Sequence, residues 1–95
     1  MAEYEDDDFL VFHDINPSAP VHLVIIPKTH FSWSDDLTRQ SKILGRIFEI
    51  APGVAEKLGI KETGYKLVMN CGRSAGQIIE HFHVHLIGGW EKGVF

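Results

Sequence analysis

The sequence predicts an α+β domain in which one main helix packs across a small antiparallel sheet. Apolar and aromatic residues form short runs of strand length, and turn-forming residues separate these runs. One longer segment repeats its apolar residues every three or four positions, as an amphipathic helix does. The elements follow in the order strand, strand, helix, strand, strand, which requires no parallel crossover.

The first two predicted strands form a hairpin. Residues 9–12 (Phe-Leu-Val-Phe) are an apolar, aromatic-rich run of strand length. Residues 13–20 contain Asp, Asn and two prolines, which predict a turn. Residues 21–26 are the second strand, closed by Pro27. We expect the two strands to pair antiparallel.

The amphipathic helix is predicted to begin within residues 35–38, where Asp and Thr can cap it, and to stop at Gly59. Pro52-Gly53 lies inside this segment. Because proline lacks an N–H and presses on the carbonyl of Phe48, we expect a kink or a break there. Residues 65–70 are the third strand, residues 71–76 a turn of small residues, and residues 77–87 the fourth strand, ended by Gly88-Gly89.

Composition narrows the class of protein. The chain has 95 residues, of which 44% are hydrophobic and 23% charged, as in an ordinary globular domain. We expect residues 1–95 to form a single domain. There is no apolar run long enough for a membrane span, and the acidic beginning is unlike a secretory signal. The lone Cys71 cannot form an internal disulfide. We therefore expect a cytoplasmic protein without a membrane partner.

The net charge of −4 is concentrated at the beginning of the chain. Five of the 13 acidic residues lie within residues 3–8, which leaves eight acidic against nine basic residues elsewhere. We interpret residues 1–8 as a solvated acidic end. This balance argues against binding nucleic acid through broad electrostatic attraction, but it permits a small phosphate site.

The fourth predicted strand contains the most informative pattern. Residues 81–87 alternate strictly, so His81, His83 and His85 share one face and the apolar residues between them share the other. The apolar face is explained as core. The three imidazoles allow three interpretations: a polar solvent-facing surface, a metal site, or nucleophilic and acid–base chemistry on phosphorus.

The metal interpretation needs ligands from elsewhere, because His81 and His85 lie ~13 Å apart at Cα in a straight strand and zinc–nitrogen bonds are about 2.0–2.1 Å long. An imidazole nitrogen is a good nucleophile near neutral pH, and neighbouring imidazoles can donate to phosphate oxygens. Small residues close by in the sequence would let backbone amides approach a phosphate: Gly72, Ser74, Ala75 and Gly76.

The window 81–87 resembles the signature of the histidine triad (HIT) family, in which three histidines alternate with apolar residues. Further segments resemble this family in the same order, so that the resemblance covers residues 4–89. These segments are residues 12–17, 19–22 and 25–30 and Gly76-Gln77. The resemblance implies a small α+β fold, a homodimer, and hydrolysis or transfer of nucleotidyl groups without a metal or cofactor.

The resemblance also implies roles for individual residues. His83 would attack the α-phosphorus and form a nucleotidyl-histidine that water then cleaves. His85 would hydrogen-bond or protonate the leaving group. His81 would orient His83, partly through its backbone carbonyl, and His30 would be a fourth, supporting histidine. His13 and His22 are interpreted as structural.

The nucleotide-binding residues implied by the resemblance are Asp14, Ile15, Asn70, Gly76 and Gln77. Asp14 matches the acid that binds the ribose, since one carboxylate accepts both hydroxyls, and the alternative for Asp14 is a turn-stabilising role. Ile15 would line the base pocket. Asn70 and the Gly88-Gly89 ending favour the Hint-like branch, which cleaves purine nucleoside phosphoramidates, over the branch that cleaves dinucleoside polyphosphates.

The sequence departs from the Hint-like pattern at two places. Ile78 stands where Ser or Thr is common, and the chain lacks a short first segment of the family, which amounts to a short N-terminal truncation. The second hypothesis is therefore a nucleotide-binding protein with weak or no catalysis.

Overall fold

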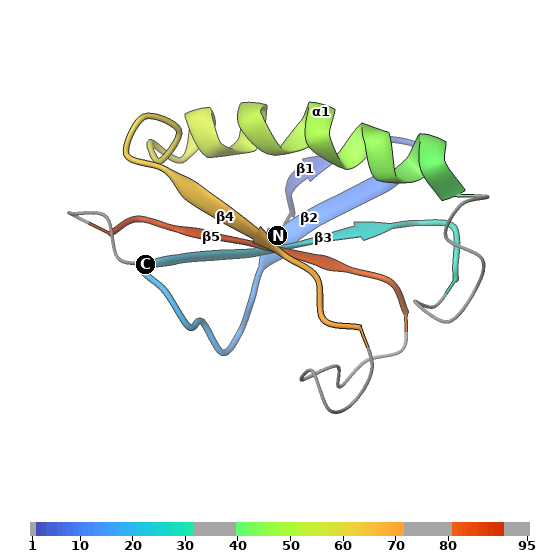
Figure 1. Ribbon diagram of the computed structural model, residues 1–95, viewed down its shortest axis with the longest axis horizontal. Helices are drawn as coiled ribbons and strands as arrows, with labels where there is room; N and C mark the ends of the chain where they lie inside the picture. Colours follow the sequence, from blue (N-terminus) through green and yellow to red (C-terminus); the bar gives the residue numbers. More distant parts are fainter. Residues whose placement is uncertain (1, 32–39, 72–80, 91–95) are drawn as a thin grey trace.

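The computed structural model describes residues 2–31, 40–71 and 81–90, and within these ranges it shows a single antiparallel sheet with one helix across one face (Figure 1). The strand order is β1-β2-β3-β5-β4. The predicted α+β class is confirmed. The elements are β1 (Ala2–Glu5), β2 (Phe9–His13), β3 (Val21–Pro27), α1 (Ser41–Lys57), β4 (Tyr65–Val68) and β5 (Val84–Gly88).

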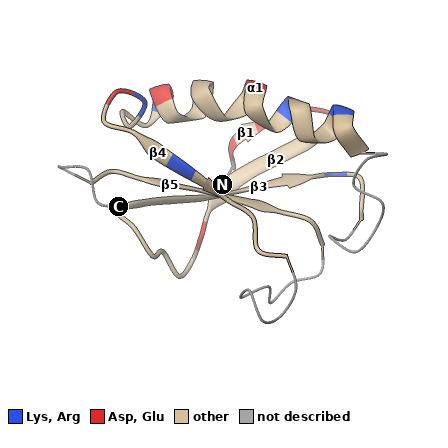
Figure 2. Cartoon of the chain, viewed as in Figure 1, with Lys and Arg blue, Asp and Glu red and all other residues tan. Residues whose placement is uncertain are grey.

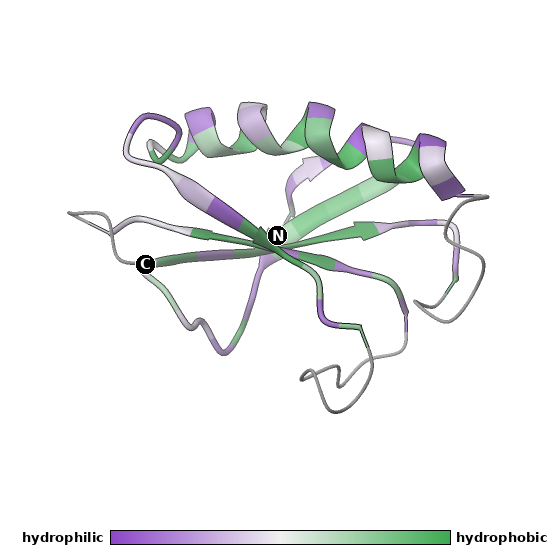
Figure 3. Cartoon of the chain, in the orientation of Figure 1, coloured by the Kyte–Doolittle hydropathy of each residue, from purple (hydrophilic) through white to green (hydrophobic). Residues whose placement is uncertain are grey.

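The predicted hairpin is present, because β2 pairs antiparallel with β3 from Phe9↔Pro27 to His13↔Leu23. Alternate residues of each strand point to α1, and Phe9, Val11, Leu23 and Ile25 are fully buried there. Figure 3 shows that β2, β3 and β5 consist largely of hydrophobic residues, and the buried ones form a single core cluster with residues of α1.

Residues 2–5 form a strand that the sequence did not predict, although every residue of 2–8 is at least partly exposed to solvent. β1 pairs antiparallel with β2 and is the edge of the sheet. Figure 2 shows the acidic residues at β1 beside α1 and the absence of charged residues from β3 and β5. The acidic side chains are paired with bases on other elements: Glu3 with His13 (3.1 Å) and Lys57 (3.3 Å), Glu5 with Lys28 (2.7 Å), and Asp6 with Arg46 (2.6 Å).

Helix α1 runs without interruption through Pro52, so the break allowed for at Pro52-Gly53 does not occur. Buried residues precede and follow Pro52, and their packing on the sheet offsets the backbone bond that proline removes. The helix ends where predicted, since Gly59 has φ +75°, a conformation that glycine adopts readily. The predicted capping segment, residues 35–38, lies outside the described residues. No helix in the described ranges is long and apolar enough to span a membrane.

The last two strands pair with each other, and β5 lies between β4 and β3. β4 ends two residues before the predicted end, and β5 begins after His83, although the alternation of burial extends back to His81. Gly88 belongs to β5 rather than ending it. The position favours glycine, because a Cβ there would lie only 3.0 Å from the carbonyl oxygen of Gly64. Phe82, Val84 and Leu86 are buried in the core, as predicted.

Candidate active site

The histidine-bearing face of β5 is the sheet face opposite to α1. In β3, His22 lies beside Ile87 of β5 and Val24 lies beside His85, so His22 and His85 are diagonal neighbours on this face. The strand alternation therefore brings one histidine of β3 to the histidines at the start of β5. Both His83 and His85 are half-buried.

The backbone orients the ring of His83. Its Nδ1 lies 2.8 Å from the carbonyl oxygen of His81. A carbonyl oxygen only accepts, so Nδ1 carries the proton and donates it. In the neutral ring, Nε2 then keeps its lone pair, which is the state that a nucleophilic imidazole requires.

The side chain of His81 is held by a second carbonyl. Its Nε2 donates to the backbone oxygen of Pro27 at 3.0 Å, at the end of β3. The ring of His30 contacts that of His81 edge-on, with centroids 4.5 Å apart, and His30 is exposed. His30 therefore lies beside His81.

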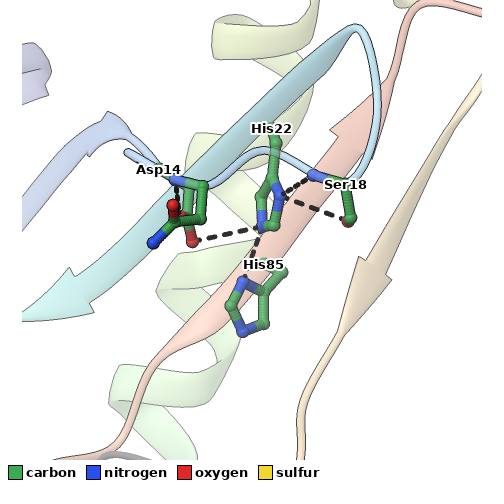
Figure 4. Close-up of polar contacts among 5 residues, drawn as sticks. Asp14, Ser18, His22 and His85 are labelled. Carbon is green, nitrogen blue, oxygen red and sulfur yellow. Dashed lines mark hydrogen bonds and ion pairs between the residues drawn. The ribbon is translucent and has the colours of Figure 1, made fainter.

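A hydrogen-bonded chain leads to His85 from the connection between β2 and β3 (Figure 4). The backbone N–H of Ser18 donates to Nδ1 of His22 at 3.0 Å, and Ser18 Oγ lies 3.3 Å from the same atom. His22 Nε2 lies 2.9 Å from Nδ1 of His85. His22 is only 8% exposed, so water cannot readily replace these partners.

The direction of this chain follows from its first bond. Because Nδ1 of His22 accepts from an amide, the neutral ring carries its proton on Nε2 and donates it to His85. Nδ1 of His85 is then an acceptor, and Nε2 of His85 carries a proton. The rings of His83 and His85 are 5.0 Å apart at their centroids. The site thus places an imidazole lone pair next to an imidazole N–H donor.

Burial lowers the pKa of His85 from its ordinary value of 6.5, and the neighbouring His83 and His22 lower it further, while Asp14 acts in the opposite direction. His85 is therefore held in its neutral form at neutral pH. A neutral His85 agrees with the hydrogen-bonded chain, in which its Nδ1 accepts.

Asp14 lies at the start of the connection between β2 and β3. Its Oδ1 accepts from the backbone N–H of Asn16 at 2.8 Å, which is the turn-stabilising role considered above. Its Oδ2 lies 3.5 Å from Nε2 of His22. One carboxylate thus supports the turn and also approaches the histidine chain.

The remaining predicted binding residues are dispersed. Ile15 is 91% exposed and borders a shallow apolar groove of about 510 Å³ together with Leu10 and Phe12 of β2. Asn70 is half-buried, just beyond the end of β4. Gly76 and Gln77 lie outside the described residues, as do Ile78 and the small residues of 72–75.

Comparisons with known proteins agree with this arrangement. The HIT domain family matches residues 2–92. The chain belongs to the HIT family. A relative from Escherichia coli (strain K12), named purine nucleoside phosphoramidase, is 42% identical over 91 residues, which cover 95% of this chain and 76% of the relative. A relative from Helicobacter pylori, named an uncharacterized HIT-like protein, is 45% identical over 87 residues, 90% of this chain and 80% of the relative.

Solved structures of HIT proteins share the fold. A HIT family hydrolase from Clostridium thermocellum is 45% identical and superposes with a TM-score of 0.91 over 100% of this chain and 84% of its own. A HIT family hydrolase from Legionella pneumophila is 40% identical, with a TM-score of 0.88 over 96% of this chain and 84% of its own. The resemblance read from the sequence is therefore confirmed at the level of family and fold.

The histidine chain of this HIT domain also bears on the metal interpretation. Ligand atoms of Asp14, His22 and His85 lie within 4.8 Å of one another. A metal needs an unprotonated nitrogen, but Nε2 of His22 carries a proton as long as Nδ1 accepts from Ser18. In this hydrogen-bonded state, Nε2 of His22 offers no lone pair to a metal.

His22 is the residue that sequence reasoning placed outside the site. It was interpreted as structural, but it is buried and lies 2.9 Å from His85. The alternation within residues 21–26 puts His22 on the face that carries His85 only once β3 and β5 are known to be neighbours. That pairing joins strands far apart in the sequence, so no local signal reveals it.

Proposed function

We propose that this HIT-family protein is a hydrolase that cleaves purine nucleoside 5′-phosphoramidates through a nucleotidyl intermediate on His83. The observation that carries the proposal is the pair of complementary rings. His83 offers a lone pair at Nε2, because its Nδ1 donates to the carbonyl of His81, and His85 offers an N–H at Nε2. The name of the Escherichia coli relative supports the substrate class.

In the first step, Nε2 of His83 attacks the α-phosphorus and a phosphorus–nitrogen bond to the leaving amine breaks. The leaving nitrogen takes a proton from Nε2 of His85, to which His22 donates at the other ring nitrogen. The negative charge left on the His85–His22 pair is offset by the positive charge on the nucleotidyl imidazole of His83 beside it.

In the second step, water attacks the same phosphorus and the bond between phosphorus and Nε2 of His83 breaks. The proton that the water loses returns to His85, so the protein ends in its starting state and a nucleoside monophosphate leaves. The bond from Nδ1 of His83 to the His81 carbonyl is present throughout and keeps the ring aligned for both displacements.

Nucleotide recognition is assigned to the residues around Asp14. We place the ribose hydroxyls at the carboxylate of Asp14 and the purine ring over the apolar groove beside Ile15. An isoleucine that is 91% exposed next to an apolar groove is suited to cover one face of a planar ring. Asn70, Gly76 and Gln77 remain assigned to nucleotide binding, and His30 to support of His81.

The proposal is tested by replacing the nucleophile. His83→Ala should abolish turnover of an adenosine phosphoramidate, with a loss of at least about a thousandfold in kcat, because covalent catalysis is lost. Calorimetry should show that the variant still binds AMP, and thermal unfolding should show that it still folds. Unchanged turnover in His83→Ala would overturn the proposal.

A substrate panel separates the proposed activity from its alternatives. Adenosine and guanosine phosphoramidates are compared with a dinucleoside polyphosphate, and the reaction is quenched to detect a labelled nucleotidyl-histidine. Preference for the polyphosphate would reassign the substrate. Tight AMP binding with no turnover and no labelled histidine would favour a nucleotide-binding protein that does not catalyse.

We also propose that the protein is a homodimer. β4 is an edge strand, with β5 as its single neighbour in the described sheet. Beside it lies an apolar groove that exposes Phe48 (69%) and Met69 (42%). Edge strands and exposed apolar patches of this kind are surfaces that proteins cover. The groove is lined by Leu44, Ile47, Phe48, Leu67, Met69, Phe82 and Val84.

A further inference from the structure

The Nε2 atom of His22 has one proton and two acceptors within reach. Nδ1 of His85 lies 2.9 Å away and Oδ2 of Asp14 lies 3.5 Å away (Figure 4). The other ring nitrogen of His22 is occupied, because it accepts from the amide of Ser18. The single Nε2 proton therefore has to serve two acceptors, and the other tautomer would satisfy neither of them and would also lose the bond to Ser18.

We infer that Asp14 and His85 compete for the Nε2 proton of His22, so that binding of a ribose diol by Asp14 strengthens the hydrogen bond from His22 to His85. In this inference His22 is a positioning residue that couples recognition of the ribose to the proton donor of the reaction. It rests on the proposed function, because it gives Asp14 and His85 the roles assigned there.

The competition follows from the strengths of the two acceptors. An ionised carboxylate accepts more strongly than a neutral imidazole, so Asp14 weakens the shorter bond to His85 although it lies farther away. Two ribose hydroxyls donating to Asp14, in addition to the Asn16 amide, share the negative charge of its carboxylate among three donors and reduce its attraction for the His22 proton. The Nε2 proton of His22 is then donated mainly to Nδ1 of His85.

The strength of the hydrogen bond at Nδ1 of His85 decides whether its other ring nitrogen, Nε2, carries a proton. A strong donor at Nδ1 holds the proton of the neutral ring on Nε2, where the leaving group can take it. A weak donor lets His85 adopt the opposite tautomer, which presents a lone pair to the leaving group and cannot protonate it. A bound ribose would therefore raise the reactivity of the site as well as its affinity.

Spectroscopy tests the coupling without any turnover. Imidazole NMR can follow the Nε2 proton of His22 and its coupling to Nδ1 of His85 across the hydrogen bond. Adding AMP should shift this proton downfield and strengthen the coupling, whereas 2′,3′-dideoxy-AMP should do neither. In the ligand-free protein, Asp14→Asn should produce the same change as AMP, because it removes the carboxylate that competes.

Kinetics tests whether the coupling affects the reaction. In the wild-type protein, a 2′,3′-dideoxy phosphoramidate should lose about tenfold or more in kcat, in addition to a rise in KM. His22→Phe keeps a ring but has no proton to share, so the ribose and dideoxy substrates should have nearly equal kcat values. His22→Gln, whose amide can donate towards His85, should recover part of the difference.

The possible outcomes are distinct. If the His22 proton is insensitive both to AMP and to Asp14→Asn, the inference is overturned. An equal kcat penalty for the dideoxy substrate in wild-type and His22→Phe proteins overturns it as well. If instead His83→Ala retains turnover, the proposed function fails, while the ligand-free Asp14→Asn spectrum still decides whether Asp14 and His85 compete.

Discussion

Three chemically identical side chains are held in different ways because the backbone gives each one a different hydrogen-bond partner. The carbonyl of His81 takes the Nδ1 proton of His83, the carbonyl of Pro27 takes the Nε2 proton of His81, and the amide of Ser18 sets the ring of His22. Each backbone partner fixes which nitrogen carries the proton of the neutral ring. The backbone geometry therefore sets the tautomers on which the proposed roles of these histidines depend.

The first residue-scale prediction concerns His81, which orients its neighbour by a backbone atom. His81→Ala removes the side-chain bond to Pro27 but keeps the carbonyl that accepts from His83. We expect turnover to fall by about 10- to 100-fold through a small displacement of the nucleophile, far less than in His83→Ala. Steady-state kinetics with a phosphoramidate measures both variants.

His81→Gln is the matched control, because its amide can still donate to the Pro27 carbonyl, and it should recover most of the loss. A loss in His81→Ala as large as that in His83→Ala, with no recovery in His81→Gln, would show that the imidazole of His81 takes part in the chemistry.

The sequence predicted the triad face because alternation in a strand is a local property, which the burial of Phe82, Val84 and Leu86 bears out. It did not predict His22, whose position depends on the pairing of β3 with β5. A single histidine in a strand has no partner that the sequence alone can name. The roles of His83, His85 and His30 came from the family resemblance and remain predictions.

At the scale of elements, β1 was not predicted because its sequence is acidic and contains no β-branched residue. What holds it is contact with other elements. It pairs with β2, and its charges bind bases on β2 and α1 and just after β3. The long apolar repeat of α1 was predicted correctly, and so was its stop at Gly59. Local patterns thus identify elements that carry core residues, whereas an edge strand depends on pairing.

Asp6 leads to an element-scale prediction, because it joins the turn after β1 to α1. Its Oδ1 accepts from the amides of Asp8 and Phe9, and its Oδ2 accepts from Tyr4 and Arg46. These donors, the Tyr4 hydroxyl first, hold the pKa of Asp6 below its ordinary value of 3.8. Asp6→Asn should lower the free energy of unfolding by about 1–2 kcal/mol at neutral pH, measured by urea denaturation.

The pH dependence of this difference has a definite sign. A lowered folded-state pKa stabilises the fold fully above the unfolded value, and this contribution disappears as the pH falls through the folded value. The gap between wild type and Asp6→Asn should therefore be constant down to a pH of about 4–5 and shrink below it. Asp7→Asn makes the same change of charge at an exposed residue and should cost less than about 0.5 kcal/mol. A gap that persists at the lowest pH would contradict the ionic role of Asp6.

At the scale of the whole molecule, the core residues and the proposed catalytic residues lie on opposite faces of the sheet. Helix α1 covers one face of the sheet (Figure 1), where the buried core lies, and the opposite face carries His22, His83 and His85. The two sheet edges also differ. β1 is acidic and its acids are paired with bases, whereas β4 adjoins the apolar groove at Phe48 and Met69. Paired acidic side chains protect β1 against pairing with another chain, so we expect a partner at the β4 side instead.

The last prediction follows from that difference. If a second copy covers the groove beside β4, Phe48→Glu places a charge in the apolar contact and should give a monomer at micromolar concentration by light scattering. Its fold should survive, because Phe48 is 69% exposed within one chain. Lys61→Glu adds the same acid at an exposed residue after α1 and should leave the dimer intact. A wild-type protein that is monomeric under these conditions would contradict the proposed dimer. A dimer that Phe48→Glu does not weaken would show that the two copies meet at another surface.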